Sequence, residues 1–290
     1  MNRSVDRPFS QVDVFTDTPL LGNPLAVVHD ADGLDDERMQ AFARWTNLSE
    51  TSFLAAPTEA GADYRVRIFT PDGELPFAGH PTLGSCHAWL EAGGAPKSAD
   101  EVVQQCGVGL VRVRRSDGRL AFAAPPLDAG PVRAEQVDEL AAALGIDPSR
   151  VVDSQWLRNG PNWLGLLLAS AADVLAVEPD AQRMKSFEKV GVIGPVGPRP
   201  AAAPGSSAAP AFEVRGFVSG RMVYEDPVTG SLNAGFAQWL IGSGRAPAAY
   251  VAAQGTRLGR AGRVHVARDA DATIWIGGDC ITCVHGSVTL

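Results

Sequence analysis

Cysteine is scarce in this chain, and its few cysteines do not form the pattern of a metal or redox site. Four cysteines in 290 residues are too few for a disulfide scaffold at this length, which fits a reducing compartment. Cys280 and Cys283 have the C-x-x-C spacing, but they lie in a strand-like run, where residues three apart point to opposite faces. No second pair and no nearby histidine pair completes a zinc set, so the sequence predicts structural cysteines and no metal.

Positive charge is also in short supply. The chain has 25 lysines and arginines against 33 acidic residues, a formal net charge of -8. Nucleic-acid binders need clustered Lys and Arg to displace counterions from phosphates. The nearest approach to a cluster, Arg112, Arg114 and Arg115, alternates with valines as the solvent face of a strand does. The sequence therefore predicts no nucleic-acid partner.

Long apolar runs are missing as well. Residues 1–11 contain no apolar core of the about 7 to 15 residues that a signal peptide requires. The longest apolar stretches, such as residues 163–169, are far shorter than the roughly 20 residues that cross a bilayer. We therefore expect a soluble, cytoplasmic protein with no membrane partner.

The chain does have enough apolar residues for two compact halves. It is about twice the usual domain size, and 45% of its residues are hydrophobic. Short β-runs, separated by Gly and Pro, outnumber the helices, and this pattern predicts an α+β fold in which strands dominate. Pro125-Pro126 and the turn residues after it mark the predicted boundary between an N-terminal half, 1–127, and a C-terminal half, 128–290. The last strand could return to the N-terminal half.

The periodicity of apolar residues predicts the individual elements. Strands are expected over residues 9–15, 25–28, 52–55, 64–69, 102–105, 110–114, 163–169, 191–196 and within 274–284. Helices are expected over residues 35–46, 81–91, 137–144 and 180–189. The stretch 197–210 is rich in Pro, Ala, Gly and Ser and predicts a flexible surface loop.

A short internal echo favours a duplicated architecture. Residues 81–85 and 227–231 both read P-x-x-G-S, and each is expected to follow a strand and to open a helix. Helix N-termini carry free N–H groups and a positive dipole end, so two facing N-termini would bind a carboxylate. Proline at the first helical position would cost no hydrogen bond, and Gly84 and Gly230 would let the backbone approach a ligand. Ordinary helix starts explain either echo equally well.

Ionisable residues adjoin both echoes. His80 lies between Gly79 and Pro81, and Asp226 directly precedes Pro227. His80 would project from a helix mouth toward a ligand, whereas we expect structural roles for the other four histidines. Glu50 lies between a predicted helix and a strand, with apolar neighbours that could raise its pKa for proton transfer. The residues alone favour a solvated turn position for Glu50.

Several segments, taken together and in this order, resemble the phenazine biosynthesis PhzF family. They are Gly22-Asn23-Pro24, Asn47-Leu48-Ser49-Glu50-Thr51, Ile68-Phe69-Thr70-Pro71, Glu74-Leu75-Pro76-Phe77-Ala78-Gly79-His80-Pro81-Thr82-Leu83-Gly84 and Glu225-Asp226-Pro227-Val228-Thr229-Gly230-Ser231. They spread over most of the chain, with few matches between residues 131 and 210.

The resemblance implies a diaminopimelate epimerase-like fold. Two similar barrel-like halves would each wrap a mostly antiparallel sheet around a central helix, with the active site between them. The resemblance also implies that Glu50 shuttles a proton and that His80 and Asp226 orient or polarise the substrate. Hydrogen bonds from Gly79, Gly230 and Ser231, with Asp72 as a lesser candidate, would bind the substrate.

The implied activity is a cofactor-independent isomerisation of a small acid. The family's namesake reaction isomerises trans-2,3-dihydro-3-hydroxyanthranilate, and we expect a similar proton and double-bond shift on a small unsaturated cyclic carboxylic or amino acid in a biosynthetic pathway. The resemblance also suggests a homodimer. Two alternatives stay open: an amino-acid epimerase or racemase of the same fold, and a non-catalytic family member that binds a small acid or a protein. Racemases of this fold use two opposed cysteines, and Ala78 and Asp226 occupy those places here.

Overall fold

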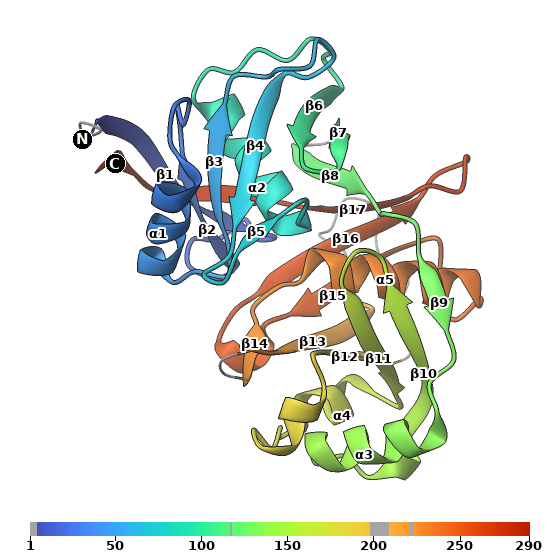
Figure 1. Cartoon of the computed structure of the whole chain (residues 1–290). Coiled ribbons are helices and arrows are strands. Elements are labelled where there is room, and N and C mark those ends of the chain that lie inside the picture. Colours follow the sequence, from blue (N-terminus) through green and yellow to red (C-terminus); the bar gives the residue numbers. More distant parts are fainter. Residues whose placement is uncertain (1–4, 117, 198–208, 221–222) are drawn as a thin grey trace. The chain divides into compact units, whose positions relative to one another are not determined.

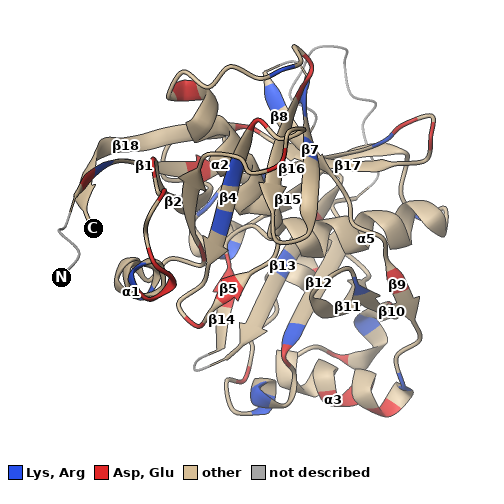
Figure 2. Cartoon of the chain, turned by 45° about the horizontal axis from the view of Figure 1, so that its top comes forward, with Lys and Arg blue, Asp and Glu red and all other residues tan. Residues whose placement is uncertain are grey.

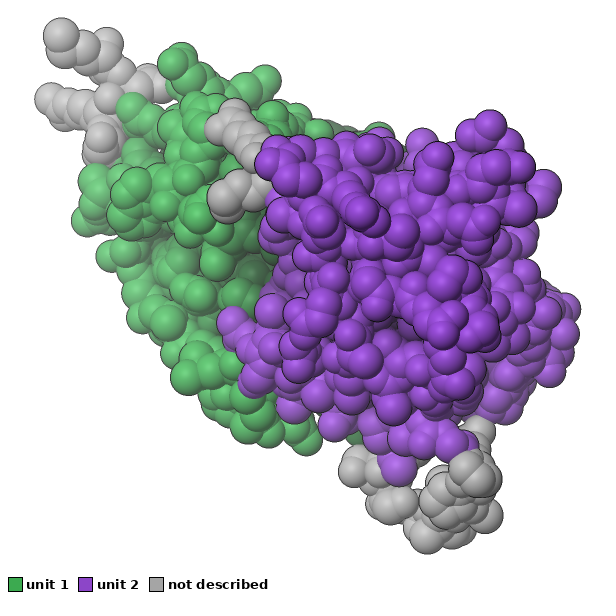
Figure 3. Space-filling view, turned by 90° about the horizontal axis from the view of Figure 1, so that it is seen from below, with its two compact units in different colours: residues 1–123, 277–290 green, residues 124–276 purple. Residues whose placement is uncertain are grey.

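The computed structural model describes residues 5–116, 118–197, 209–220 and 223–290. The chain divides into two compact units: unit 1 comprises residues 1–123 and 277–290, and unit 2 comprises residues 124–276 (Figure 3). We expected the boundary between the two halves to lie between residues 127 and 128. In the structure, the chain first passes from unit 1 to unit 2 between residues 123 and 124. The loop expected over 197–210 lies, except at its two ends, outside the described residues.

In its described residues, unit 1 has two helices among many strands (Figure 1). Its elements are β1 (Asp6–Val14), β2 (Asn23–Val28), α1 (Asp36–Thr46), β3 (Thr51–Ala55), β4 (Tyr64–Phe69), β5 (Glu74–Leu75), α2 (Gly79–Glu91), β6 (Glu101–Cys106), β7 (Gly109–Ser116), β8 (Arg119–Ala123) and β18 (Cys280–Thr289). β17 (Ile274–Gly278) crosses from unit 2 into unit 1.

Unit 2 has the same mixture of strands and few helices. Its elements are β9 (Asp128–Gly130), α3 (Ala134–Leu144), β10 (Val151–Arg158), β11 (Asn162–Leu168), α4 (Ala171–Leu175), β12 (Lys189–Pro195), β13 (Phe212–Ser219), β14 (Val223–Asp226), α5 (Gly230–Gly242), β15 (Ala249–Gln254) and β16 (Gly262–Arg268). Short 3-10 turns cover Pro148–Arg150, Arg183–Ser186 and Thr256–Leu258. The predicted α+β class is confirmed.

The order of strand pairings is the same in the two units. In unit 1, β1 pairs antiparallel with β2, β2 parallel with β3, β3 antiparallel with β4, and β4 antiparallel with β5 but parallel with β6. In unit 2, β10, β11, β12, β13, β14 and β15 repeat this series in the same order. In each series one helix precedes the third strand and another precedes the last. This correspondence supports an internal duplication.

Each unit is built around one buried helix. α2 packs against β1, β2, β3, β4, β6, β7, β8 and β18, and its residues from Gly79 to Cys86 are all buried. α5 has the same length and is likewise mostly buried, with contacts to β10, β11 and β16. Most of the stability of both helices should therefore come from packing against the surrounding strands.

The first long helix shows why local sequence predicted it well. The Asp35 side chain accepts a hydrogen bond from the Arg38 N–H, and Asp36 and Glu37 lie in the first turn, where the positive end of the helix dipole favours them. α1 ends where Asn47 takes a left-handed conformation at φ 53°, which asparagine tolerates better than most residues. This ending places Glu50 directly before β3.

Two expected elements were wrong or differently divided. The helix expected over 180–189 is only a 3-10 turn at Arg183–Ser186, because Met184 is the one residue that this turn buries and a helix there would gain little from packing. The single strand-like run over 274–284 is two strands, β17 and β18, which are separated at Asp279.

The register expected for the P-x-x-G-S echo was also wrong. α2 begins at Gly79, so Pro81 is its third residue, whereas Pro227 lies three residues before α5. Proline is still tolerated within a first turn, where its missing N–H would have had no partner. The residues at equivalent helical positions are therefore Gly79-His80 and Gly230-Ser231.

Gly84 serves packing and not a ligand, contrary to expectation. It lies inside α2, and a Cβ atom there would come within 2.6 Å of Leu25 Cδ2 and 2.8 Å of Val14 Cγ2. The missing side chain lets α2 lie close to β1 and β2.

Candidate active site

Glu50 and His80 lie together in unit 1, as their neighbouring motifs suggested. His80 Nδ1 is 3.3 Å from Glu50 Oε2, and the two side chains are 5% and 18% exposed. The contact joins the loop between α1 and β3 to the first turn of α2. It brings a carboxylate to the mouth of a buried helix.

Burial keeps the His80 imidazole neutral. Loss of hydration lowers its pKa to about 3, since a buried site disfavours the charged ring. In a neutral ring one nitrogen carries an N–H and the other a lone pair, and Nδ1 is the nitrogen that lies close to Glu50 Oε2. His80 Nε2 is buried and has no hydrogen-bond partner within the described part of the chain. The ring therefore lies beside Glu50 without a positive charge.

The first turn of α2 offers backbone donors next to this pair. Its N-cap residue is Ala78, so no side chain caps the helix, and the first N–H groups of a helix have no partner within it. Pro81 lacks an N–H, which leaves those of Gly79 and His80 to face outward. These donors and the positive dipole end would favour a bound anion.

A matching arrangement lies in unit 2, at the start of α5. The Thr229 hydroxyl donates to Asp226 Oδ2 over 2.6 Å, so Thr229 holds a carboxylate instead of capping its own helix. Ser231 Oγ accepts a hydrogen bond from the Trp163 indole N–H over 3.1 Å. The acceptor role leaves the Ser231 hydroxyl proton available to a ligand, and Gly230 adds a first-turn N–H.

A buried glutamine that the sequence analysis missed organises this second helix mouth. Gln254, at the end of β15, is fully buried. Its Oε1 accepts from the Thr229 N–H (3.0 Å) and from Asn233 Nδ2 (2.8 Å), and its Nε2 donates to Thr229 Oγ1 (2.9 Å). Because Gln254 donates to the Thr229 oxygen, the Thr229 proton is directed to Asp226. No local motif marks Gln254, which lies 25 residues from Thr229 along the chain.

The structure therefore brings the predicted site residues together in two groups. Glu50, Gly79 and His80 belong to unit 1, and Asp226, Gly230 and Ser231 belong to unit 2. That these groups share one cleft stays a prediction. Asp72, the lesser candidate, is an exposed residue of the turn between β4 and β5.

Cysteine and metal chemistry find no support among the described residues. No group of three or more His, Cys, Asp or Glu side chains in that part of the chain is placed to hold a metal ion. All four cysteines are free, and burial raises the pKa of the Cys86 thiol to about 12. Cys86 lies inside α2 and is fully buried, so it is not placed at the mouth of that helix.

The distribution of charge and the length of the apolar helices can be described from the structure. In the view of Figure 2, Lys and Arg are interspersed with Asp and Glu over the coloured residues and form no continuous basic tract. Among the residues that the structure describes, no helix is long and apolar enough to cross a membrane.

Comparison with known proteins identifies the family. The family model of the phenazine biosynthesis-like proteins, PhzC-PhzF, matches residues 12–286. The chain is 35% identical over 301 residues to antisense-enhancing sequence 1 of Schizosaccharomyces pombe, covering 97% of this chain and 98% of that protein. It is 38% identical over 185 residues to trans-2,3-dihydro-3-hydroxyanthranilate isomerase of Pseudomonas aeruginosa, covering 62% and 64%.

Solved structures share the fold. The crystal structure of a Bacillus anthracis PhzF family protein aligns with a TM-score of 0.80 at 23% identity, over 99% of this chain and all of that one. The chain belongs to the phenazine biosynthesis-like PhzC-PhzF family and is an enzyme of the isomerase class. The predicted family membership is confirmed.

Proposed function

We propose that this enzyme is a cofactor-independent isomerase that shifts a proton and a double bond on a small unsaturated cyclic carboxylic or amino acid, in a biosynthetic pathway. The observation that carries this proposal is the contact between Glu50 and the neutral His80 at an uncapped helix mouth. The similarity to trans-2,3-dihydro-3-hydroxyanthranilate isomerase supports the substrate class.

Glu50 is the proposed proton shuttle. Its carboxylate would take a proton from an allylic or ring carbon and return it to another carbon of the same molecule, so that no external acid or base is consumed. A positioned base of this kind contributes on the order of 10² to 10⁴ in rate. His80, whose Nδ1 lies 3.3 Å from Glu50 Oε2, would limit the movement of the Glu50 side chain toward the helix.

The helix mouths would bind the substrate and stabilise charge in the transition state. First-turn N–H groups of α2 and α5 would hold its carboxylate, and preorganised donors cost no reorganisation when charge develops. Asp226, fixed by Thr229, would accept a hydrogen bond from a substrate amino or hydroxyl group. These roles require that the two helix mouths meet in one cleft.

The epimerase alternative is disfavoured by the positions of the cysteines. Two-cysteine racemases need a thiol at each helix mouth, whereas the residues that directly precede α2 and α5 here are Ala78 and Thr229. A stereochemical assay with amino acids would separate this activity from an isomerisation. A non-catalytic family member would bind acids without exchanging protons.

The decisive experiment is proton exchange in D₂O followed by NMR. Wild type, Glu50→Gln and the control Glu37→Gln, an exposed residue in the first turn of α1, would be incubated with trans-2,3-dihydro-3-hydroxyanthranilate and several unsaturated cyclic amino acids. We expect deuterium at a shifted position with wild type and Glu37→Gln only. Full activity of folded Glu50→Gln would contradict the assignment of the base.

Oligomeric state is a separate expectation from the family resemblance. We propose a homodimer, and light scattering coupled to gel filtration would measure its mass. A mass equal to the 30.4 kDa of one chain would refute it.

A further inference from the structure

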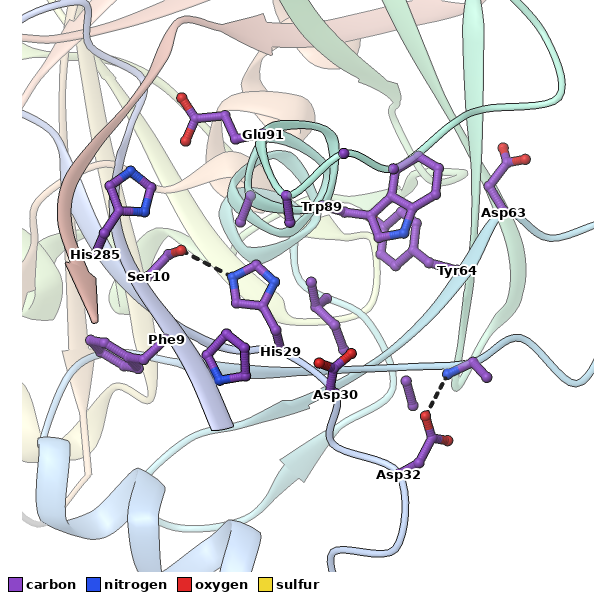
Figure 4. Close-up of a pocket in the computed structure, with 18 of the residues that line it drawn as sticks. Phe9, Ser10, His29, Asp30, Asp32, Asp63, Tyr64, Trp89, Glu91 and His285 are labelled. Carbon is purple, nitrogen blue, oxygen red and sulfur yellow. Dashed lines mark hydrogen bonds between the residues drawn. The ribbon is translucent and has the colours of Figure 1, made fainter. Parts of the chain in front are cut away.

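A second site candidate lies inside unit 1, at the other end of its central helix. A cavity of about 690 Å³ opens beside the last turn of α2, and strands β1, β3, β4 and β18 and the residues after β2 supply the rest of its lining (Figure 4). None of the predicted site residues lines it. α2 has 13 residues, so its two ends are roughly 18 Å apart at 1.5 Å per residue.

The lining is acidic. It includes four carboxylates, those of Asp30, Asp32, Asp63 and Glu91, and no Lys or Arg side chain. The carbonyl end of α2 adds the negative end of the helix dipole. Arg7, which is not part of the lining, donates to the main-chain oxygens of Asp30 and Asp32. This charge favours a cationic ligand.

Three of the four carboxylates already have partners. Asp63 accepts from the N–H groups of Lys97 and Val103, Asp32 accepts from the Ala56 N–H, and Glu91 accepts from the Thr282 hydroxyl. The carboxylate of Asp30 has no hydrogen-bond partner among the residues that the structure describes. Asp30 also has a left-handed backbone, φ 51°, which an aspartate adopts less readily than a glycine. Asp30 is therefore the carboxylate available to a ligand.

His29 provides a second ligand-binding atom that is independent of the acidic residues. His29 is a buried residue, 8% exposed, and its Nε2 lies 3.0 Å from Ser10 Oγ. Burial lowers the pKa of His29, with the nearby Asp30 acting in the opposite direction. If Nε2–H donates to Ser10, the other ring nitrogen is an acceptor. That nitrogen has no partner within the described residues, and Figure 4 shows the ring directed into the cavity.

An aromatic wall lines the side of the cavity opposite Phe9 and His285 (Figure 4). Trp89 stacks on Tyr64 with ring centroids 5.3 Å apart and an interplanar angle of 22°. Such a surface excludes water and binds the carbon chain of a ligand. A ligand that pairs with the Asp30 carboxylate, donates to the His29 ring nitrogen and packs on Trp89 would have a cationic N–H group on a short apolar chain.

We propose that this cavity binds a small primary alkylamine, whose ammonium group pairs with Asp30 and donates a hydrogen bond to His29 and whose carbon chain lies against Trp89. The interaction involves no covalent step. It is independent of the proposed isomerase reaction and should occur in the absence of any substrate.

Calorimetric titration would test the proposal with putrescine, tetramethylammonium and glutarate as probes. An ionic strength of about 0.02 M would limit screening of the charges. We expect putrescine to bind, tetramethylammonium to bind more weakly because it has no N–H group, and glutarate not to bind. Glu50→Gln should bind putrescine as wild type does, which separates this site from the proposed active site.

The variant Asp30→Asn tests the ammonium contact. Asparagine adopts the left-handed conformation readily, so this variant should fold and should bind putrescine at least about ten-fold more weakly, a loss of 1.4 kcal/mol. The control Asp128→Asn removes one charge from a side chain of unit 2 that is 77% exposed and should bind as wild type. His29→Phe removes the ring acceptor and should also bind putrescine more weakly. This variant provides the test if Asp30→Asn does not fold.

Three results would overturn the proposal. They are absence of putrescine binding to the wild type, equal binding by Asp30→Asn and Asp128→Asn, and binding of glutarate as tight as that of putrescine.

Discussion

His80 illustrates how the position of one side chain sets its chemistry. It is the second residue of α2 and is buried, so the ring is neutral over the range in which free histidine titrates. The motif around His80 predicted its place at a helix mouth. The loss of hydration that lowers its pKa depends on α2 being enclosed by strands, and neighbouring residues in the sequence do not reveal it.

His80 should make the stability of the protein depend on pH. Its folded-state pKa of about 3 lies below the unfolded value of 6.5, so protons bind preferentially to the unfolded chain and stability falls as pH drops from 6.5 toward 3. The expected slope is up to about 1.4 kcal/mol per pH unit. Urea unfolding of wild type and His80→Asn at pH 7 and pH 5 would measure it. The difference in the free energy of unfolding between wild type and His80→Asn should be smaller at pH 5 than at pH 7. An equal or larger difference at pH 5 would contradict this account.

Gln254 should contribute strongly to the stability of unit 2. Gln254→Leu removes the acceptor of the Thr229 N–H and of Asn233 Nδ2, and each orphaned buried group costs about 1–3 kcal/mol. We expect a loss of that size in urea unfolding, together with weaker turnover, because Thr229 would no longer be held toward Asp226. Gln182→Leu, at an exposed position, is the control and should change stability little. Equal stabilities of the two variants would refute the role of Gln254.

At the scale of elements, the helix starts were the most instructive comparison with the sequence. The capping residues of α1 and the motifs around α2 and α5 predicted where helices occur, because such signals act over three or four neighbouring positions. The position of the P-x-x-G-S echo relative to each helix start could not be predicted in this way. The first residue of a helix depends on where the preceding strand ends and on what the helix packs against. The same reason explains why 180–189 is not a helix.

Gly84 should tolerate no side chain because α2 lies so close to β1 and β2. Alanine normally favours a helix over glycine by about 0.5–1 kcal/mol, but here its Cβ would clash with Leu25 and Val14, and overpacking costs about 1–3 kcal/mol. We expect Gly84→Ala to lower the thermal midpoint. Gly73→Ala, where nothing lies within 4 Å of the added carbon, should leave it nearly unchanged; a stabilised Gly84→Ala would show that the helix can move away.

At the scale of the whole molecule, the fold class and the family could be predicted from the sequence, but only part of the site could. Glu50 and His80 are brought together as expected, and Asp226 stands beside the start of α5. The glutamine behind Asp226 and the acidic cavity beyond α2 are formed by strands that are distant in sequence. Pairings of that kind arise from tertiary structure and carry no short motif.

Unit 2 should fold as an isolated fragment. It is one continuous segment, residues 124–276, with its own buried cluster that includes Leu140, Leu166 and Val192. We expect the fragment to show cooperative thermal unfolding by circular dichroism. The fragment 1–123, which lacks β18, the partner of β1 along its whole length, should not. Cooperative unfolding of both fragments would contradict the dependence of unit 1 on its last strand.

The pairing of β1 with β18 has a consequence for how the protein is made. Asp6 lies opposite Thr289 and Val14 opposite Cys280, so β1 pairs with a strand that is synthesised much later. Until β18 has left the ribosome, one edge of β1 is open, whereas the continuous segment of unit 2 can already fold. An exposed strand edge invites pairing with other chains, so nascent molecules should be most prone to aggregate during the interval between the synthesis of β1 and that of β18.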